Sequence, residues 1–360
     1  MILLLCLLAV CFAAVHGNVN FEVDVVFTWK RQPSEKELHI ISSKYCSQKH
    51  GHKASRFRET GTLEYAIHAV KSNLPWVRNI FLVTNDERPC WLGNDNPDVT
   101  IITHEQIWPL SRIQTDLPTF NSIAIETHLH RIPGLSEYFI YLNDDMFVGK
   151  TLSKSYFFDP LGRPLVSLKS TDKVKMESVD RIAAQKAPWY LIGTHGPYIS
   201  RISTIETIQS IWSDYFNTTS SSRCRTKADT QSKYANHVKP PFWVYNWYGA
   251  VTNTSASVVT AVQFMDYHFT PEAFYAKLLQ NPPSEMFTLN DDFSLNPVRA
   301  SGEIFNLVQF LSRYFSPYPN SYGKNFSTCG LQIDRGDTTI MTQFRSVQCV
   351  FACACVVCAF

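Results

Sequence analysis

The segment Leu117–Gly149 limits the possible folds of this chain more than any other part of it. Its first half predicts a helix that begins at Pro118 and ends near Pro133. Its second half contains the apolar run Tyr138–Leu142, which is typical of a buried strand. A helix that leads directly into a buried strand is a unit of α/β folds, so this segment predicts that class.

Three polar residues, Asn143, Asp144 and Asp145, stand at the end of this strand. Mg²⁺ is usually held by one or two carboxylates together with substrate phosphate oxygens, so the Asp pair favours a nucleotide diphosphate site. An isolated Asn-Asp-Asp triplet is also typical of a turn or a helix cap. Consecutive strand side chains point to opposite faces, so both Asp residues can serve one metal only if the strand ends there and the backbone turns.

The rest of the first half repeats the alternation of strands and helices. Further strands are expected at Val23–Trp29, Ile80–Thr84 and Val99–Thr103. Apolar residues from Leu63 to Val70 recur at helical spacing before Pro75 ends the helix. We therefore predict a mostly parallel, nucleotide-binding α/β sheet, Rossmann-like or GT-A-like, which binds ligands at the carboxyl ends of its strands. Asn85 follows one such end.

Helices are expected to dominate after about Pro160, and no low-complexity linker separates an independent domain. We expect a mainly helical half, residues 161–330, to fold back onto the α/β half, residues 18–160, and to close the active site. The aromatic segment Pro240–Tyr248 either lines a sugar site or packs in the core, the second being the more common use of aromatic side chains.

The N-terminal residues 1–17 are typical of a signal peptide, since Ile2–Val15 is apolar and small residues precede a cleavage site at Asn18. This predicts entry into the secretory pathway, with the ER or Golgi lumen or secretion as the destination. The sequons at Asn217, Asn253 and Asn325 are compatible with that route. A retained anchor is the weaker alternative, because a membrane span needs about 20 apolar residues.

Cysteines are spread through the body of the chain. Cys46, Cys90, Cys224 and Cys329 can form up to two disulfides in an oxidising lumen, in any of three pairings. The tail, residues 331–360, ends in the apolar run VQCVFACACVVCAF, whose spacing is a poor zinc pattern. It is too short to span a bilayer, so we expect at most weak membrane association. The tail is an S-acylated patch, the end of a GPI-type signal or the stump of a misread gene model, and these alternatives stay open.

Composition agrees with an enzyme-sized globular protein. The chain has 360 residues, of which 45% are hydrophobic, and this suffices for a substantial core. The formal net charge is only +2 and the basic residues are scattered, which argues against nucleic acid as a partner.

Several blocks of the sequence share one order with a known family. DVVFTW at Asp24–Trp29 resembles a first block, and Arg56–Leu92, NPDVTIITHEQI and LNDDMF at Leu142–Phe147 follow in the register of a second. Thr194–Gln231, with THGPYISRISTIETI and SSRCRTKADTQ, is similar to a third block, and LNDDF at Leu289–Phe293 to a fourth. These blocks resemble the Stealth family of hexose-1-phosphate transferases, which includes bacterial capsule polymerases and the alpha/beta subunit of GlcNAc-1-phosphotransferase.

This resemblance implies an enzyme that moves a sugar 1-phosphate from a UDP-sugar to a hydroxyl of a glycan or glycoprotein and releases UMP. GlcNAc-1-phosphate is the expected group that is transferred. Mg²⁺ or Mn²⁺ is the implied cofactor. Asp145 is the expected metal ligand, with Asp291 and Asp292 as its complement from across the cleft, and Asp144 is assigned to catalysis. As an isolated pair, Asp291 and Asp292 are also typical of a helix cap.

The third block supplies the expected base and cations. His195, in the setting Gly-Thr-His-Gly-Pro, is the candidate base, because an imidazole titrates near neutrality. Arg225 is expected to act in catalysis and Arg223 to bind substrate, since guanidinium groups offer forked donors that suit phosphate. Arg56 and Arg58 offer the same chemistry, although either pair is also compatible with ordinary solvated surface.

Nucleotide contacts are expected from Asp24 and Trp29, and Asn85 and Asn143 complete the predicted substrate-binding set. The family's first block usually continues with a small acidic or amide-rich turn, whereas Lys30-Arg31-Gln32 stands here. Two other functions stay open at this point. One is a GT-A-like glycosyltransferase that releases UDP, and the other is a secreted carbohydrate-binding protein without turnover.

Overall fold

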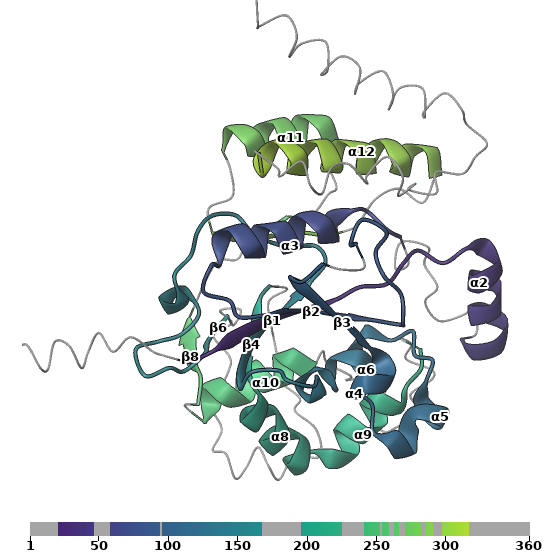
Figure 1. Cartoon of the computed structure of the whole chain (residues 1–360), viewed down its shortest axis with the longest axis vertical. Coiled ribbons are helices and arrows are strands. Elements are labelled where there is room, and N and C mark those ends of the chain that lie inside the picture. The colour runs from purple at the N-terminus through teal and green to yellow at the C-terminus, as the bar shows by residue number, and fades with distance from the viewer. Residues whose placement is uncertain are drawn as a thin grey trace, which may run out of the picture. The chain divides into compact units, whose positions relative to one another are not determined.

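A computed structural model shows a central sheet with helices on both faces (Figure 1). The structure describes residues 21–46, 58–93, 96–167, 196–224, 241–252, 254–258, 263–265, 271–281, 285–290 and 297–316. All of them belong to the compact unit that ends at Pro317. The predicted signal peptide, residues 1–17, and the Cys-rich tail, residues 331–360, lie outside the described residues.

The central sheet has five strands in the order β3-β2-β1-β4-β7. They are β1 (Val23–Thr28), β2 (Ile80–Thr84), β3 (Val99–Thr103), β4 (Tyr138–Asn143) and β7 (Tyr198–Arg201). β1 to β4 are parallel, and β7 is antiparallel to β4. Apolar residues in the middle strand are wholly buried, as a parallel sheet covered on both faces requires. The predicted α/β class and the four predicted strands are confirmed.

The crossover from β1 to β2 contains α2 (Glu35–Ile40), a π-helical turn at Ile41–Tyr45, and α3 (Thr62–Asn73). α3 lies on one face of the sheet, and α12 packs against it (Figure 1). Tyr65 of α3 is hydrogen bonded to Ser312 of α12, which explains why this helix is buried on both sides. The helix predicted between Leu63 and Val70 is confirmed.

The opposite face is covered by helices from both halves of the chain (Figure 1). They are α4 (His104–Ile107), α5 (Ile113–Asp116), α6 (Ser122–Glu126), α8 (Ile202–Ile211), α9 (Ser213–Ser221) and α10 (Pro241–Val251). α10 packs against β7 and α8. Its aromatic residues Phe242 and Tyr245 are at most 2% exposed, so these side chains fill the core.

The helix predicted to begin at Pro118 is wrong in its bounds. The N–H of Phe120 donates to the carbonyl of Arg223 at 2.7 Å, and this bridge keeps the backbone extended. The helix α6 therefore begins only at Ser122, after Asn121 has accepted a hydrogen bond from the N–H of Ile123 as its cap. It ends at Glu126, and a separate 3₁₀ turn follows at residues 129–131.

Two small sheets accompany the central sheet, and one of them joins a strand from residues 18–160 to a strand from residues 161–330. β5 (Met146–Val148) pairs with β10 (Met286–Leu289), which also pairs with β9 (Gln263–Met265). β6 (Leu165–Ser167) pairs with β8 (Ala256–Val258). The remaining helices are α11 (Pro271–Gln280) and α12 (Pro297–Tyr314). Within the described residues, none of the helices has the length and apolar character needed to cross a membrane.

Candidate active site

The candidate site lies where β1 and β4 end, side by side at the carboxyl edge of the sheet. From β1 the chain adds β2 and β3 on one side and then places β4 on the other. Such a change of direction leaves a crevice outside the strand ends, where open α/β sheets bind their ligands. Thr28 and Asn143 are partners in the register at this edge, so Trp29 and Asp144 are the first residues beyond it.

The Asp pair forms a tight turn in this crevice. β4 ends at Asn143 and β5 begins at Met146, so Asp144 and Asp145 are released from the alternation of a strand. The Asp145 carbonyl accepts the N–H of Leu289 at 2.9 Å, which ties the turn to the end of β10. Both side chains are half-buried.

This donor set fits a divalent cation of the kind that the sequence predicts. Carboxylate oxygens on a turn beside a crevice match Mg²⁺, which keeps part of its shell for waters and phosphate oxygens. In the described part of the chain, no three His, Cys, Asp or Glu side chains converge in a way that could hold a metal ion. Asp291 and Asp292, the other two predicted ligands, lie outside the described residues.

A third acidic residue, Glu126, acts electrostatically on Tyr141 of β4, and the sequence analysis missed it. It ends α6 and is only 8% exposed. The pKa of Tyr141 is raised by burial and further by the charges of Glu126 and Asp144, so this phenol lies within electrostatic reach of both carboxylates. Its hydroxyl is 3.0 Å from that of Thr28. The sequence signal that could have revealed Glu126 is an acidic residue directly after the mostly apolar run Ser-Ile-Ala-Ile.

Basic residues occupy the other side of the crevice. The Lys30 ammonium lies 3.0 Å and 3.1 Å from the two carboxylate oxygens of Glu87, which follows β2. Arg31 also reaches Glu87, and it pairs with Glu37 at 2.7 Å. The Glu37 carboxylate has a pKa lowered to about 2, first by its hydrogen bond from Arg31 and then by hydrogen bonds from Ser34.

Trp29 and Asn85, both predicted to bind substrate, lie at this carboxyl edge. Trp29 is only 9% exposed, and its indole N–H donates to Glu59, whose pKa is raised by burial. Asn85 is half-buried in a turn that the Thr84 hydroxyl closes through bonds with the backbone of Glu87. The structure therefore brings Trp29, Asn85, Asn143 and the Asp pair to one edge.

Asp24 lies at the opposite end of the sheet from this edge. Thr28 lies four positions further along β1, which is about 13 Å of extended chain. Its carboxylate is fully buried and accepts two hydrogen bonds from Arg78 and one each from the N–H groups of Asn79 and Ser136. The structure thus corrects the expected nucleotide contact, because all of these partners hold the amino-terminal edge together.

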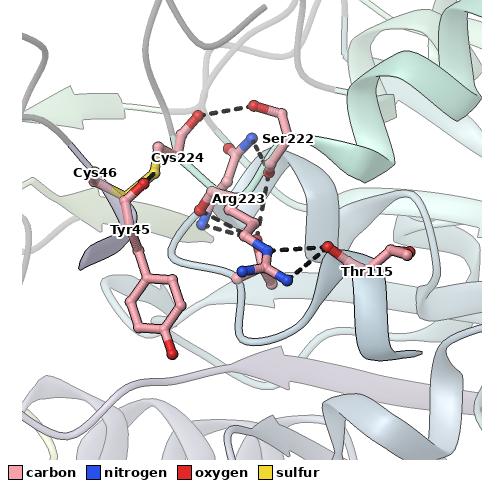
Figure 2. Close-up of a disulfide and its surroundings, with 8 residues drawn as sticks. Tyr45, Cys46, Thr115, Ser222, Arg223 and Cys224 are labelled. Carbon is pink, nitrogen blue, oxygen red and sulfur yellow. Dashed lines mark hydrogen bonds between the residues drawn. A yellow bond between two sulfur atoms is a disulfide. The ribbon is translucent and has the colours of Figure 1, made fainter. Parts of the chain in front are cut away.

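The Arg223 guanidinium is held in place by hydrogen bonds (Figure 2). Its guanidinium donates to the carbonyl of Thr115 from Nε at 3.1 Å and from Nη2 at 2.6 Å, and to that of Gln114 at 3.3 Å. It also lies over the ring of Tyr45. Nε and Nη2 of the guanidinium thus donate to backbone oxygens, and substrate binding by Arg223 stays a prediction.

A disulfide stands beside Arg223. Cys46 at the end of the π-helical turn is bonded to Cys224, across 178 residues of sequence (Figure 2). The sequence alone left open which of the three possible pairings of the four cysteines occurs. Cys90 is disulfide-bonded as well. Cys329 lies outside the described residues.

Three further predicted site residues, His195, Arg225 and Arg56, also lie outside the described residues. Arg58 is half-buried at the start of the segment that leads to α3. The described part of the site is therefore the edge of the sheet formed by the carboxyl ends of β1, β2 and β4.

Comparison with known proteins identifies the blocks that form this edge. Residues 56–165 match the model of Stealth protein CR2, conserved region 2, and residues 194–249 that of Stealth protein CR3, conserved region 3. An exopolysaccharide phosphotransferase of Streptomyces coelicolor is 30% identical over 340 residues, 87% of this chain and 54% of that protein. The N-acetylglucosamine-1-phosphotransferase subunits alpha/beta of Homo sapiens are 50% identical over 105 residues, 29% of this chain and 8% of that protein.

Among solved structures, a glycosyltransferase of Streptococcus pneumoniae aligns with a TM-score of 0.40 at 13% identity, over 82% of this chain and 64% of that one. The chain spans about half the length of the first curated relatives that it matches. Residues 56–165 and 194–249 of this chain thus correspond to conserved regions 2 and 3 of the Stealth proteins.

Proposed function

We propose that this protein transfers a sugar 1-phosphate, with GlcNAc as the first sugar to test, from a UDP-sugar to a hydroxyl of a glycan, and releases UMP. One observation carries the proposal: the Asp144–Asp145 turn lies at the β1–β4 switch point. The related exopolysaccharide and capsular polysaccharide phosphotransferases support the class of reaction.

In the proposed reaction, the acceptor oxygen forms a bond to the phosphorus that carries the sugar. The bond from that phosphorus to the oxygen of the UMP phosphate breaks, and UMP leaves with the electron pair. His195 is the proposed acceptor of the hydroxyl proton, and Arg225 the proposed partner of the developing phosphate charge. The product is a phosphodiester that keeps the sugar on the transferred phosphate.

Asp145 and Asp144 would hold a divalent cation, Mg²⁺ or Mn²⁺, with Asp291 and Asp292 as the complement. The ion would neutralise the diphosphate and so lower the barrier to phosphoryl transfer. Glu126 is the proposed third acidic residue that faces the reacting groups. Its burial keeps water away, which strengthens its electrostatic interactions.

We also propose that the protein works in the lumen of the secretory pathway. Three disulfide-bonded cysteines among the described residues, Cys90 and the Cys46–Cys224 pair, support an oxidising compartment. The glycan acceptor would be found in the same compartment.

The experiment incubates the protein with UDP-GlcNAc, Mg²⁺ and a simple mannoside, and identifies the nucleotide released. UMP, with phosphate retained in the glycan product, is the expected result. Asp145→Asn should abolish it, whereas Asp214→Asn, which removes an exposed carboxylate from α9, should leave it unchanged. UDP would show that the sugar moves without its phosphate, and that outcome would replace the proposal with a glycosyltransferase.

A further inference from the structure

A lysine stands in the crevice where the family's first block usually has a small acidic or amide-rich turn. Lys30 follows Trp29 at the carboxyl end of β1, and its ammonium is held by both oxygens of Glu87 at 3.0 Å and 3.1 Å. Glu87 is itself fixed, since its N–H and carbonyl both bond to the Thr84 hydroxyl at the end of β2. The ammonium therefore has a defined place over the end of β2.

The carboxylate in this pair is fully occupied, whereas the ammonium is not. Glu87 also receives the backbone N–H of Arg31 at 3.3 Å and its guanidinium at 3.2 Å. An ammonium carries three N–H donors, and the Lys30 side chain remains 30% exposed. Lys30 can thus donate to a ligand while Glu87 holds it in position.

The ammonium lies on the side of the crevice away from the Asp pair. Glu87 extends from β2, and β1 separates β2 from β4, so about 10 Å, two strand spacings, divide Lys30 from the Asp144–Asp145 turn. That is the length scale of a nucleoside. With the diphosphate at the Asp pair, the base of the donor would reach Lys30.

A second basic group does not add to this charge. His104, the first residue after β3, is 5% exposed, and its pKa is lowered to about 4 by burial and by the charge of Lys30. Its imidazole is therefore neutral at pH 7. Arg31 also places a cation on this side of the described site, and its guanidinium is paired with both Glu37 and Glu87.

We infer that Lys30 selects the nucleobase of the donor, by donating hydrogen bonds to a ring carbonyl of uracil, with Glu87 as its positioning residue. This inference rests on the proposed function. A lysine offers donors only. A uracil ring carries an acceptor oxygen at the position where cytosine carries an amino group, so Lys30 would bind the first and be repelled by the second.

The test measures the dissociation constants of UMP and CMP by calorimetry, in the presence of Mg²⁺. The protein should bind UMP at least tenfold more tightly than CMP, because a hydrogen bond from a charged donor is worth at least that factor. Lys30→Met should weaken UMP about tenfold, whereas CMP should bind equally well or slightly more tightly. Glu87→Gln should reduce the preference for UMP in part. The matched control is Lys36→Met, which removes an exposed charge from α2 and should change neither constant.

An unchanged ratio of the two constants in folded Lys30→Met would overturn the inference. An equal loss for both nucleotides would do so too, because it would place Lys30 against the ribose or phosphate that they share. In either case, release of UMP from a UDP-sugar by the unmodified protein would leave the proposed function standing. If the unmodified protein bound neither UMP nor CMP, both the inference about Lys30 and the proposed function would be overturned.

Discussion

Asp24 and Arg78 form a two-point ion pair at the amino-terminal edge of the sheet, with Nε–Oδ1 at 2.9 Å and Nη2–Oδ2 at 2.6 Å. The Asp24 side chain is fully buried, and the N–H groups of Asn79 and Ser136 satisfy it further. One carboxylate thus joins β1 to the segments that lead into β2 and β4. The Asp24 carboxylate, which belongs to the DVVFTW block, thus stabilises the position of β1 in the sheet.

Arg78→Met should lower the free energy of unfolding by about 3 kcal/mol, because it leaves a buried carboxylate without its counter-charge. Urea unfolding measures the loss. The affinity of the folded variant for UMP should stay the same, since the pair lies at the opposite edge from the candidate site. Arg88→Met, which changes an exposed arginine, is the control. A weaker UMP affinity in folded Arg78→Met would return Asp24 to the nucleotide site.

Two buried histidines should make the protein less stable in mild acid. Burial lowers the pKa of His104 to about 4 and that of His128 to about 3, each with a smaller effect from nearby positive charge. The unfolded chain binds these protons below pH 6.5, whereas the folded protein binds them only near pH 4 or below. Their contribution to stability is therefore complete above pH 6.5 and is lost as the pH falls to about 4.

The free energy of unfolding should accordingly be about 2 kcal/mol lower per histidine at pH 5 than at pH 7.5. His128 packs on Trp108, with ring centroids 4.2 Å apart. His128→Gln should reduce the difference between the two pH values, even though it also lowers the stability itself. The exposed residue His39 gives the control, His39→Gln, which should keep the full difference. An undiminished difference in His128→Gln would contradict the buried, neutral state.

The Cys46–Cys224 disulfide should contribute about 2–4 kcal/mol, because it closes a loop that spans most of the fold. The double variant Cys46→Ala/Cys224→Ala is expected to unfold at a lower urea concentration by a corresponding amount. Dithiothreitol should then destabilise the unmodified protein more than the variant. Equal midpoints for the two oxidised proteins would mean that the native contacts around Arg223 hold this region without the bond.

Glu126→Gln should reduce sugar-phosphate transfer at least about 100-fold, the low end of what a preorganised polar group contributes through electrostatic stabilisation, while the protein stays folded. The change keeps the size of the side chain and removes the charge that acts on Tyr141. Glu105→Gln on α4 removes an exposed carboxylate and should retain full activity. Normal turnover in Glu126→Gln would show that the carboxylate acts in packing alone.

The strands were predictable because local sequence controls them. Ile80–Thr84 and Val99–Thr103 are short apolar runs, and the structure gives both strands these bounds. The start of α6 was not predictable, because it depends on a bridge between Phe120 and Cys224, which are 104 positions apart. A local helix signal at Pro118 cannot report a hydrogen bond to a distant carbonyl.

Sequence alone determined the α/β class, the resemblance to the Stealth family and the Asp pair at the end of β4, since each follows from the order of neighbouring residues. Tertiary structure alone decided which residues share an edge. It placed Asp24 and Trp29 towards opposite ends of β1, bonded Arg223 to backbone carbonyls, chose Cys224 as the partner of Cys46, and brought Glu126 within electrostatic reach of Tyr141. These outcomes depend on strand order and on contacts between distant segments, and residue type and spacing do not encode them locally.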